Sequence, residues 1–167
     1  MKKILMIALV LMPLMLMAQS KIAVVNSQEL FNLMPQKSAA EAQLKALSEK
    51  YHAEYEMLRG EFDKKYADYQ TVAADASMPD TIKDRRIQEL QESDKKMREF
   101  ERRVADDISA QREALTQPIT DKIQAAIRTA GAQGGYDLVL DTAVTPVAYI
   151  GPNTTDITPM VKKILGL

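Results

Sequence analysis

The chain lacks cysteine and tryptophan, and His52 is its single histidine in 167 residues. Without cysteine it has no disulfide framework, and one histidine leaves no pair from which the common metal sites are built. Phosphate loops, nucleophile elbows and dinucleotide fingerprints are also missing from the sequence. We therefore predict no catalytic residue, no cofactor and no metal, and we expect that the protein is not an enzyme.

Long apolar runs are confined to the beginning of the chain. Two lysines precede an apolar run from Ile4 to Met17, and the small residue Ala18 follows it. This order is typical of a secretory signal peptide, and the run is short for a membrane span of about 20 residues. A retained anchor is the alternative interpretation. We interpret residues 1–18 as a signal peptide and expect an exported protein.

A strong excess of positive charge is absent as well. Removal of the signal peptide takes away two lysines, so 20 basic residues remain against 23 acidic ones and the net charge becomes −3. Proteins that bind nucleic acid usually present a basic face to the phosphates. We therefore expect no nucleic-acid partner.

Glycine is almost absent between Gln36 and Ala130, where Gly60 is the only one. Apolar residues recur there in steps of three and four on a charged background, which predicts long helices that pack along a narrow seam. Gly60 costs about 1 kcal/mol relative to alanine inside a helix, and it is either a soft point or a neutral exposed position. The first apolar series is Leu44, Leu47, Tyr51, Tyr55, Leu58, Phe62, Tyr66, Tyr69 and Ala73.

The helical pattern breaks at residues 74–80 and then resumes. We expect Ser77 to cap the following helix, with Pro79 in its first turn. Charged residues at i,i+4 spacing, such as Glu61 with Lys65, support both helices. The second apolar series is Ile82, Leu90, Met97, Val104, Ile108, Leu115, Ile119, Ile123 and Ile127.

Two prolines flank the pair of helices. Pro35 and Pro118 lie at nearly equal distances from residue 76, so a hairpin folded at that point places them side by side at its base. Pro118 lacks the N–H that a helix needs, and we expect a kink there. Two unrelated helix irregularities are the alternative.

Short β-rich runs occur outside the helical stretch, at residues 21–26, 136–141 and 147–150. A short helix is expected up to Met34, and a final amphipathic helix begins at Asp156 or Thr158. Such a small body has a marginal core and exposed strand edges, so we expect it to associate with other copies. The candidate contact residues are Ile22, Val24, Leu138, Leu140, Val147 and Tyr149.

Tyrosine supplies most of the few aromatic side chains, and the first helix carries many of them. Tyrosine combines an apolar face with a polar tip and methionine adapts its shape, which favours weak contacts with many partner sequences. Ordinary packing between the two helices is the alternative interpretation. The candidate residues for contact with a bound protein are Tyr51, Tyr55, Phe62, Tyr66, Tyr69 and Met78.

Several stretches resemble one known family. They are Lys-Ile-Ala-Val-Val-Asn-Ser-Gln-Glu-Leu at 21–30, Pro118-Ile119 with the isoleucines that follow, and Gly-Tyr-Asp-Leu-Val-Leu-Asp at 135–141. With the signal peptide and the charged double helix, this order resembles the Skp/OmpH family of periplasmic chaperones over the whole mature chain. Well-known members are strongly basic, whereas this chain is slightly acidic, so we carry over no lipopolysaccharide site.

The resemblance implies an α+β homotrimer with a small β-rich body and one antiparallel helical hairpin, or tentacle, per subunit. Residues 19–35 and 118–167 would form the trimerisation body, and residues 36–117 the arm with its tip near 74–80. The expected function is ATP-independent holding of unfolded outer-membrane β-barrel proteins in the periplasm, with transient contact at the membrane surface. An exported coiled-coil adaptor or spacer with a single envelope partner is the alternative.

Overall fold

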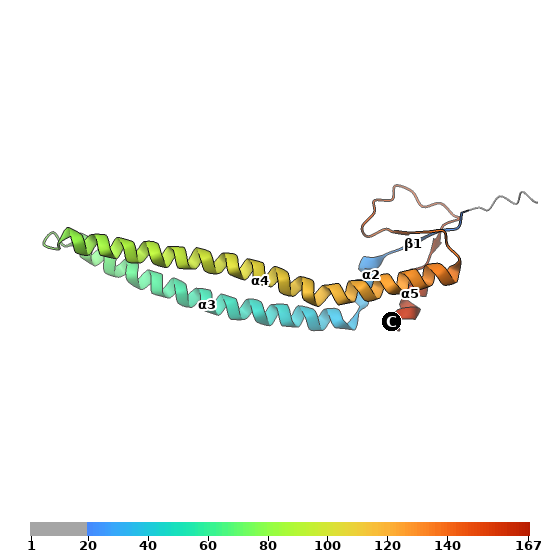
Figure 1. Cartoon of the computed structure of the whole chain (residues 1–167), viewed down its shortest axis with the longest axis horizontal. Helices are drawn as coiled ribbons and strands as arrows, with labels where there is room; N and C mark the ends of the chain where they lie inside the picture. Colours follow the sequence, from blue (N-terminus) through green and yellow to red (C-terminus); the bar gives the residue numbers. More distant parts are fainter. Residues whose placement is uncertain (1–19) are drawn as a thin grey trace, which may run out of the picture. The chain divides into compact units, whose positions relative to one another are not determined.

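The computed structural model describes residues 20–167, so the predicted signal peptide lies outside the described residues. Its elements, coloured along the chain in Figure 1, form two compact units, residues 20–32 with 122–167 (the body) and residues 33–121 (the arm). The predicted α+β class is confirmed, because a small parallel sheet accompanies long helices. In chain order they are β1 (Ile22–Val25), α2 (Ser27–Leu33), α3 (Pro35–Ala74), α4 (Asp80–Gly134), β2 (Leu138–Asp141), β3 (Thr155–Asp156) and α5 (Thr158–Leu165).

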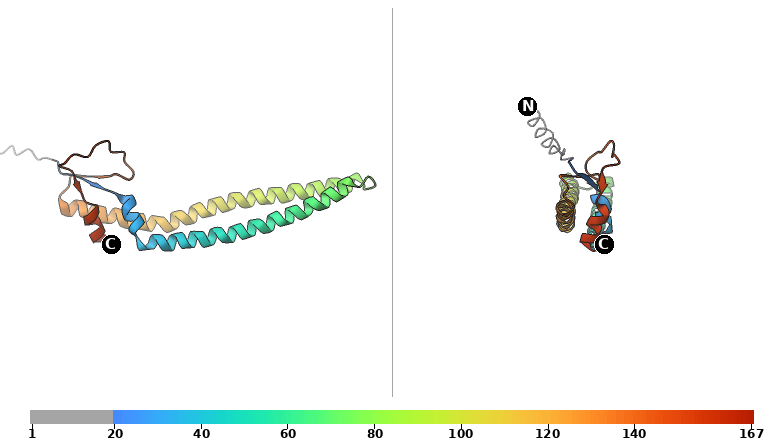
Figure 2. Two further views of the ribbon diagram at one scale, coloured as in Figure 1. Left: turned by 180° about the vertical axis from the view of Figure 1, so that it is seen from behind. Right: turned by 90° about the vertical axis from the view of Figure 1, so that its right-hand side faces the viewer.

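The arm is a hairpin of two long helices. α3 and the first part of α4 run side by side in opposite directions in both views (Figures 1 and 2). Pro35 occupies the first turn of α3, where its missing N–H is not needed, and α4 continues through Pro118 as one helix. Within residues 20–167, none of the helices combines the length and the apolar character that a membrane span requires.

The turn at the tip differs in one detail from the expectation. α3 ends at Ala74 and α4 begins at Asp80, but Ser77 does not cap α4. Its N–H and hydroxyl both donate to the Asp75 carboxylate, at 2.8 and 2.7 Å, so the hydroxyl is used within the turn. The first hydrogen bonds of α4 go to the carbonyl of Pro79 instead, from the N–H groups of Ile82 and Lys83.

Ion pairs along the arm are partly those that the spacing predicts. Asp94 pairs with Arg98 within α4. The predicted pair of Glu61 with Lys65 is not formed, because both side chains reach across the hairpin. Glu61 lies 3.8 Å from the Lys96 ammonium, and the Lys65 ammonium donates to the Ser93 hydroxyl at 3.1 Å. These two side chains thus take partners on the opposite helix, although most ion pairs of the arm lie within one helix.

The body is built on a three-stranded parallel sheet in the order β2-β1-β3. Ile22 pairs with Leu138, and Ala23 pairs with Thr155 on the other side. Parallel neighbours need a long crossover, and the connection from β1 to β2 contains the whole hairpin arm. The buried apolar residues of the body are Ala23, Val24, Val25, Leu30, Ile123, Ala126, Ala130, Ile157 and Val161.

The predicted strand at residues 147–150 is wrong. These residues lie in a connection from Thr142 to Thr154, and the third strand is β3. Pro146 and Pro152 border the run, and a proline lacks the N–H that a sheet ladder needs, which disfavours strand pairing here. Two of the proposed contact residues, Val147 and Tyr149, therefore belong to a loop.

Two features satisfy the carbonyl groups at the C-terminal end of α4, a glycine turn and the side chain of Lys21. Gly135 has φ +63°, and the N–H of Tyr136 bonds back to the carbonyl of Gly131 at 3.0 Å, as in a glycine-terminated helix. The Lys21 ammonium donates to the carbonyl of Gly134 at 2.6 Å and lies 4.4 Å from the centre of the Tyr136 ring. A cation at this position stabilises the negative end of the helix dipole.

Candidate functional site

Phe100 is the most deeply buried aromatic residue of the arm, with 3% of its surface exposed. Tyr51 of α3 meets its ring edge to face, with centroids 6.1 Å apart, and donates a hydrogen bond to the Asp107 carboxylate of α4. The predicted apolar series of α4 omitted Phe100. The signal was present, since Phe100 follows Met97 by three residues and precedes Val104 by four.

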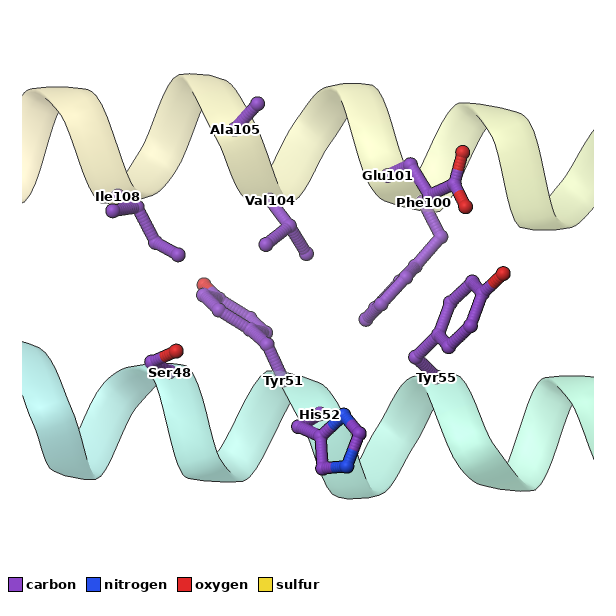
Figure 3. Close-up of a pocket in the computed structure, with 9 residues that line it drawn as sticks. All are labelled: Ser48, Tyr51, His52, Tyr55, Phe100, Glu101, Val104, Ala105 and Ile108. Carbon is purple, nitrogen blue, oxygen red and sulfur yellow. The ribbon is translucent and has the colours of Figure 1, made fainter.

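An open groove of about 420 Å³ lies on one side of Phe100, between α3 and α4 (Figure 3). We call it the aromatic groove. Its polar residues are Ser48, His52 and Glu101, and exposed Ala105 contributes only a methyl group to the α4 wall. Its floor is made by Tyr51, Tyr55, Phe100, Val104 and Ile108.

Both tyrosines of the aromatic groove are influenced by acidic neighbours. The hydrogen bond to Asp107 raises the pKa of the Tyr51 phenol above its usual value, with smaller contributions from burial and from the charges of Asp107 and Glu54. The carboxylate of Glu101 raises the pKa of Tyr55, first through hydrogen bonding and then with burial and charge. The phenols therefore stay neutral and lie in a negative potential.

A second groove, of about 270 Å³, also borders Phe100 but is otherwise lined by different residues. We call it the charged groove. The guanidinium of Arg103 lies 5.4 Å from the centre of the Phe100 ring, and Met57, 66% exposed, adds an apolar wall. Its remaining lining residues are Glu54, Leu58, Glu61, Lys96 and Glu99.

Towards the tip the seam becomes more polar. Ser93, only 5% exposed, occupies a seam position and accepts a hydrogen bond from Lys65. Phe62 and Tyr66 stack along α3 with centroids 6.4 Å apart, and Tyr66 remains 47% exposed. Ile82 and Ile87 of α4 are exposed as well. The distal arm thus leaves large apolar side chains uncovered.

The structure brings only some of the sequence candidates for protein contact together. Tyr51 and Tyr55 share the aromatic groove, and Phe62 stacks with Tyr66. Tyr69 and Met78 are half-buried further along the arm. The six residues therefore form a series along the hairpin rather than one pocket.

The candidate contact residues of the body differ in their exposure. Val24 is buried in the core of its own subunit, and Leu140 and Val147 are half-buried. Ile22 and Leu138, paired in register, are exposed at 38% and 47%. Tyr149 is 79% exposed. The same loop exposes two further apolar residues, Val144 and Ile150, which the candidate set omitted. The subunit alone leaves this apolar surface uncovered.

Groups of three or more acidic or histidine side chains that could hold a metal do not occur in residues 20–167. Ser48, His52 and Glu101 all line the aromatic groove, but among the described residues no hydrogen bond joins any two of them, as the coupling of a nucleophile to its base requires. The groove surface consists mainly of aromatic faces and aliphatic side chains, with the carboxylate of Glu101 at its edge.

Comparisons with known proteins agree with this architecture. A proposed outer membrane chaperone (OmpH-like) from Caulobacter crescentus CB15 has a similar crystal structure, with a TM-score of 0.67 over 89% of this chain and 85% of that chain. The two sequences are 16% identical, so this likeness concerns the fold. No curated protein matches the chain. The model of the family described as outer membrane protein (OmpH-like) matches residues 21–165, and the chain therefore belongs to the OmpH-like family.

Proposed function

We propose that this protein is an ATP-independent holdase that acts in the periplasm and binds unfolded outer-membrane β-barrel proteins between helical arms. Membership of the OmpH-like family supports a role in outer-membrane protein biogenesis. The observation that carries the mechanism is the row of uncovered apolar side chains along a hairpin too slender to have a core of its own.

The arm supplies many weak contacts rather than one tight site. Tyr66, Met57 and Ile82 are each exposed on the hairpin, and each can cover part of an apolar segment of a client. Burial of apolar surface contributes about 25 cal/mol per Å², so several partial contacts hold a client without fixing its conformation. Release needs no nucleotide, because folding of the client into the membrane removes the segments that the arms bind.

We propose that the body holds the subunits together and that the assembly is a homotrimer. β2 is an edge strand with exposed Leu138, and the following loop exposes Val144 and Tyr149. An exposed edge beside an apolar loop favours pairing with another copy of the chain. Three arms anchored on one trimeric body would enclose a client. We also propose that the assembly makes transient contact with the membrane surface where clients are delivered.

The test of the holdase proposal is suppression of aggregation. A urea-denatured porin is diluted into buffer without ATP, with and without the purified mature protein, and light scattering is recorded. We expect scattering to fall as the protein approaches a few-fold molar excess. Unchanged scattering at that excess would contradict the proposal, and capture of one stoichiometric envelope partner without porins would favour an adaptor.

Two sets of variants separate holding from assembly. Replacing Tyr66 and Tyr69 by serine should weaken suppression while the native mass stays the same; replacing Gln70 and Thr71 by serine in the same segment is the matched control. Replacing Leu138 and Leu140 by aspartate should reduce the native mass to that of a single chain. A stable trimer after the aspartate substitutions would show that subunit contacts lie elsewhere.

A further inference from the structure

The two grooves beside Phe100 differ in whether they contain a cation. In the charged groove, Arg103 of the chain itself lies over the Phe100 ring, and Lys96 is a second basic lining residue. The aromatic groove is lined by the same Phe100 together with Tyr51 and Tyr55. Its nine lining residues include the carboxylate of Glu101 but neither lysine nor arginine. One groove has thus paired its aromatic surface with a guanidinium, and the other has not.

The charge around the aromatic groove is negative. Four carboxylates, those of Glu54, Glu56, Glu101 and Asp107, act on the two phenols against the guanidiniums of Arg59 and Arg103. The raised pKa values of Tyr51 and Tyr55 are a consequence of this excess. A cation entering the groove is attracted, whereas a phosphate or a carboxylate is repelled.

The space and the surface suit a side chain with an apolar stem and a flat charged end. Tyr55 is half-buried, so part of its ring is accessible, and Ala105 leaves room on the opposite helix. Figure 3 shows Tyr55 and Phe100 extending from opposite helices into the groove, with Glu101 beside them. A guanidinium stacks on aromatic faces and forms two parallel hydrogen bonds to a carboxylate, whereas an ammonium acts as a point charge.

We infer that the aromatic groove binds arginine side chains of extended, unfolded polypeptides, with the guanidinium at Glu101 and the stem against Tyr55 and Phe100. This inference rests on the proposed holdase function and adds a chemical preference to it. The arms select client segments in which arginine stands among apolar residues, and the groove-bearing side of each hairpin faces the client.

The test uses the intact mature protein and two labelled peptides. Both are unstructured aliphatic sequences with one central residue, arginine in the first and its neutral analogue citrulline in the second. Fluorescence anisotropy measures the two dissociation constants. We expect the arginine peptide to bind about tenfold more tightly, the scale of one charge-assisted contact plus ring stacking, and the preference to shrink with added salt.

Protein variants assign the preference to the groove. Glu101→Gln should reduce the ratio of the two dissociation constants to about one. Glu99→Gln is an equal charge change in the charged groove and should leave this ratio unchanged. Ala105→Leu should fill the groove and weaken binding of the arginine peptide, while the helical content stays the same. Glu99, Glu101 and Ala105 are exposed, so we expect the three variants to fold, and circular dichroism checks this.

Equal affinity for the two peptides, a preference that survives Glu101→Gln, or an equal loss in Glu99→Gln would each overturn the inference. Suppression of porin aggregation is measured on the same preparations. If suppression is intact while the peptide preference is missing, the holdase proposal stands and the arginine site fails. If suppression and peptide binding are both missing, both proposals fail.

Discussion

The middle and the distal part of the arm are built from the same two helices, but they are held together differently. In the middle, Phe100 is buried, Tyr51 packs on its edge, and a phenol-carboxylate hydrogen bond joins the helices. Towards the tip, the buried seam position is Ser93, and Tyr66 and Ile82 are exposed. The buried apolar side chains of the arm thus lie at its middle and its base, at Phe100, Met34, Ala40 and Ile119, and not towards the tip.

This difference suggests a division of labour along one hairpin. Regions with few buried apolar contacts open locally at a lower free energy than well-packed regions of the same protein. The middle of the arm therefore fixes how the two helices align, and the distal part can yield to clients of different size. Of the exposed apolar side chains of the hairpin, Tyr66, Ile82 and Ile87 lie in this distal part, and Met57 lies beside Phe100.

Removing the central ring should have the largest effect on this difference. Phe100→Ala deletes a buried ring, and such deletions destabilise proteins by about 3 kcal/mol or more. We expect the amide hydrogens around Tyr51 and Val104 to exchange about two orders of magnitude faster, which hydrogen–deuterium exchange with mass spectrometry measures. The control Tyr66→Ala, at a half-exposed ring, should change exchange much less. Equal acceleration in the two variants would mean that the middle holds the arm no better than the tip.

Gly60→Ala should have the next largest effect, and it should stabilise the arm rather than destabilise it. A methyl group at Gly60 meets no atom within 4 Å, and alanine is favoured over glycine in a helix by about 1 kcal/mol. Gly60→Ala should therefore raise the urea concentration at which the arm unfolds. If client suppression falls at the same time, Gly60 is a point of flexibility that the function uses; unchanged suppression would leave it a neutral glycine.

Ser93→Ala should have a smaller effect than Gly60→Ala. Alanine raises helix propensity by about 0.5 kcal/mol, and the Lys65 ammonium released from the hydroxyl can turn to water. We expect a slight increase in the melting temperature and slower exchange in the distal arm. A clear decrease would show that the Lys65–Ser93 contact holds the distal seam, and the contrast between the two parts would be weaker than we infer.

Much of the fold follows from the sequence because helices depend on local periodicity. The steps of three and four along α3, the break at residues 74–80 and the amphipathic pattern of α5 each predict an element that the structure contains. These features need only neighbours within a few turns of the same chain.

The predictions that failed depend on which partner a residue takes, and composition alone does not determine that. The run at residues 147–150 has strand composition, but it pairs with neither β2 nor β3, the two edge strands of the sheet. Ser77 has the chemistry of a helix cap but bonds to Asp75 instead. The aromatic groove required the register between α3 and α4, which the two separate apolar series do not determine.

The smallest expected effect is that of pH on stability. Acid should destabilise the distal part of the arm, and alkali should destabilise its middle. Near the tip, hydrogen bonds from Ser77 lower the pKa of Asp75, and those from Arg86 and Arg85 lower the pKa of Glu89. A folded-state pKa below the unfolded one adds stability that is complete above the unfolded value, near pH 4, and is lost as pH falls through the folded value. Acid should therefore loosen the tip.

In the middle of the arm the sign is reversed. The Tyr51 phenol has a raised pKa, so its stabilising contribution is complete below its unfolded value, near pH 10, and is lost as pH rises through the folded value. Melting temperatures recorded from pH 3 to pH 11 should fall less on the acid side in Asp75→Asn with Glu89→Gln, and less on the alkaline side in Tyr51→Phe. Each variant is the control for the other. If a variant flattened both sides, the two parts of the arm would unfold as one unit and the division between them would be lost.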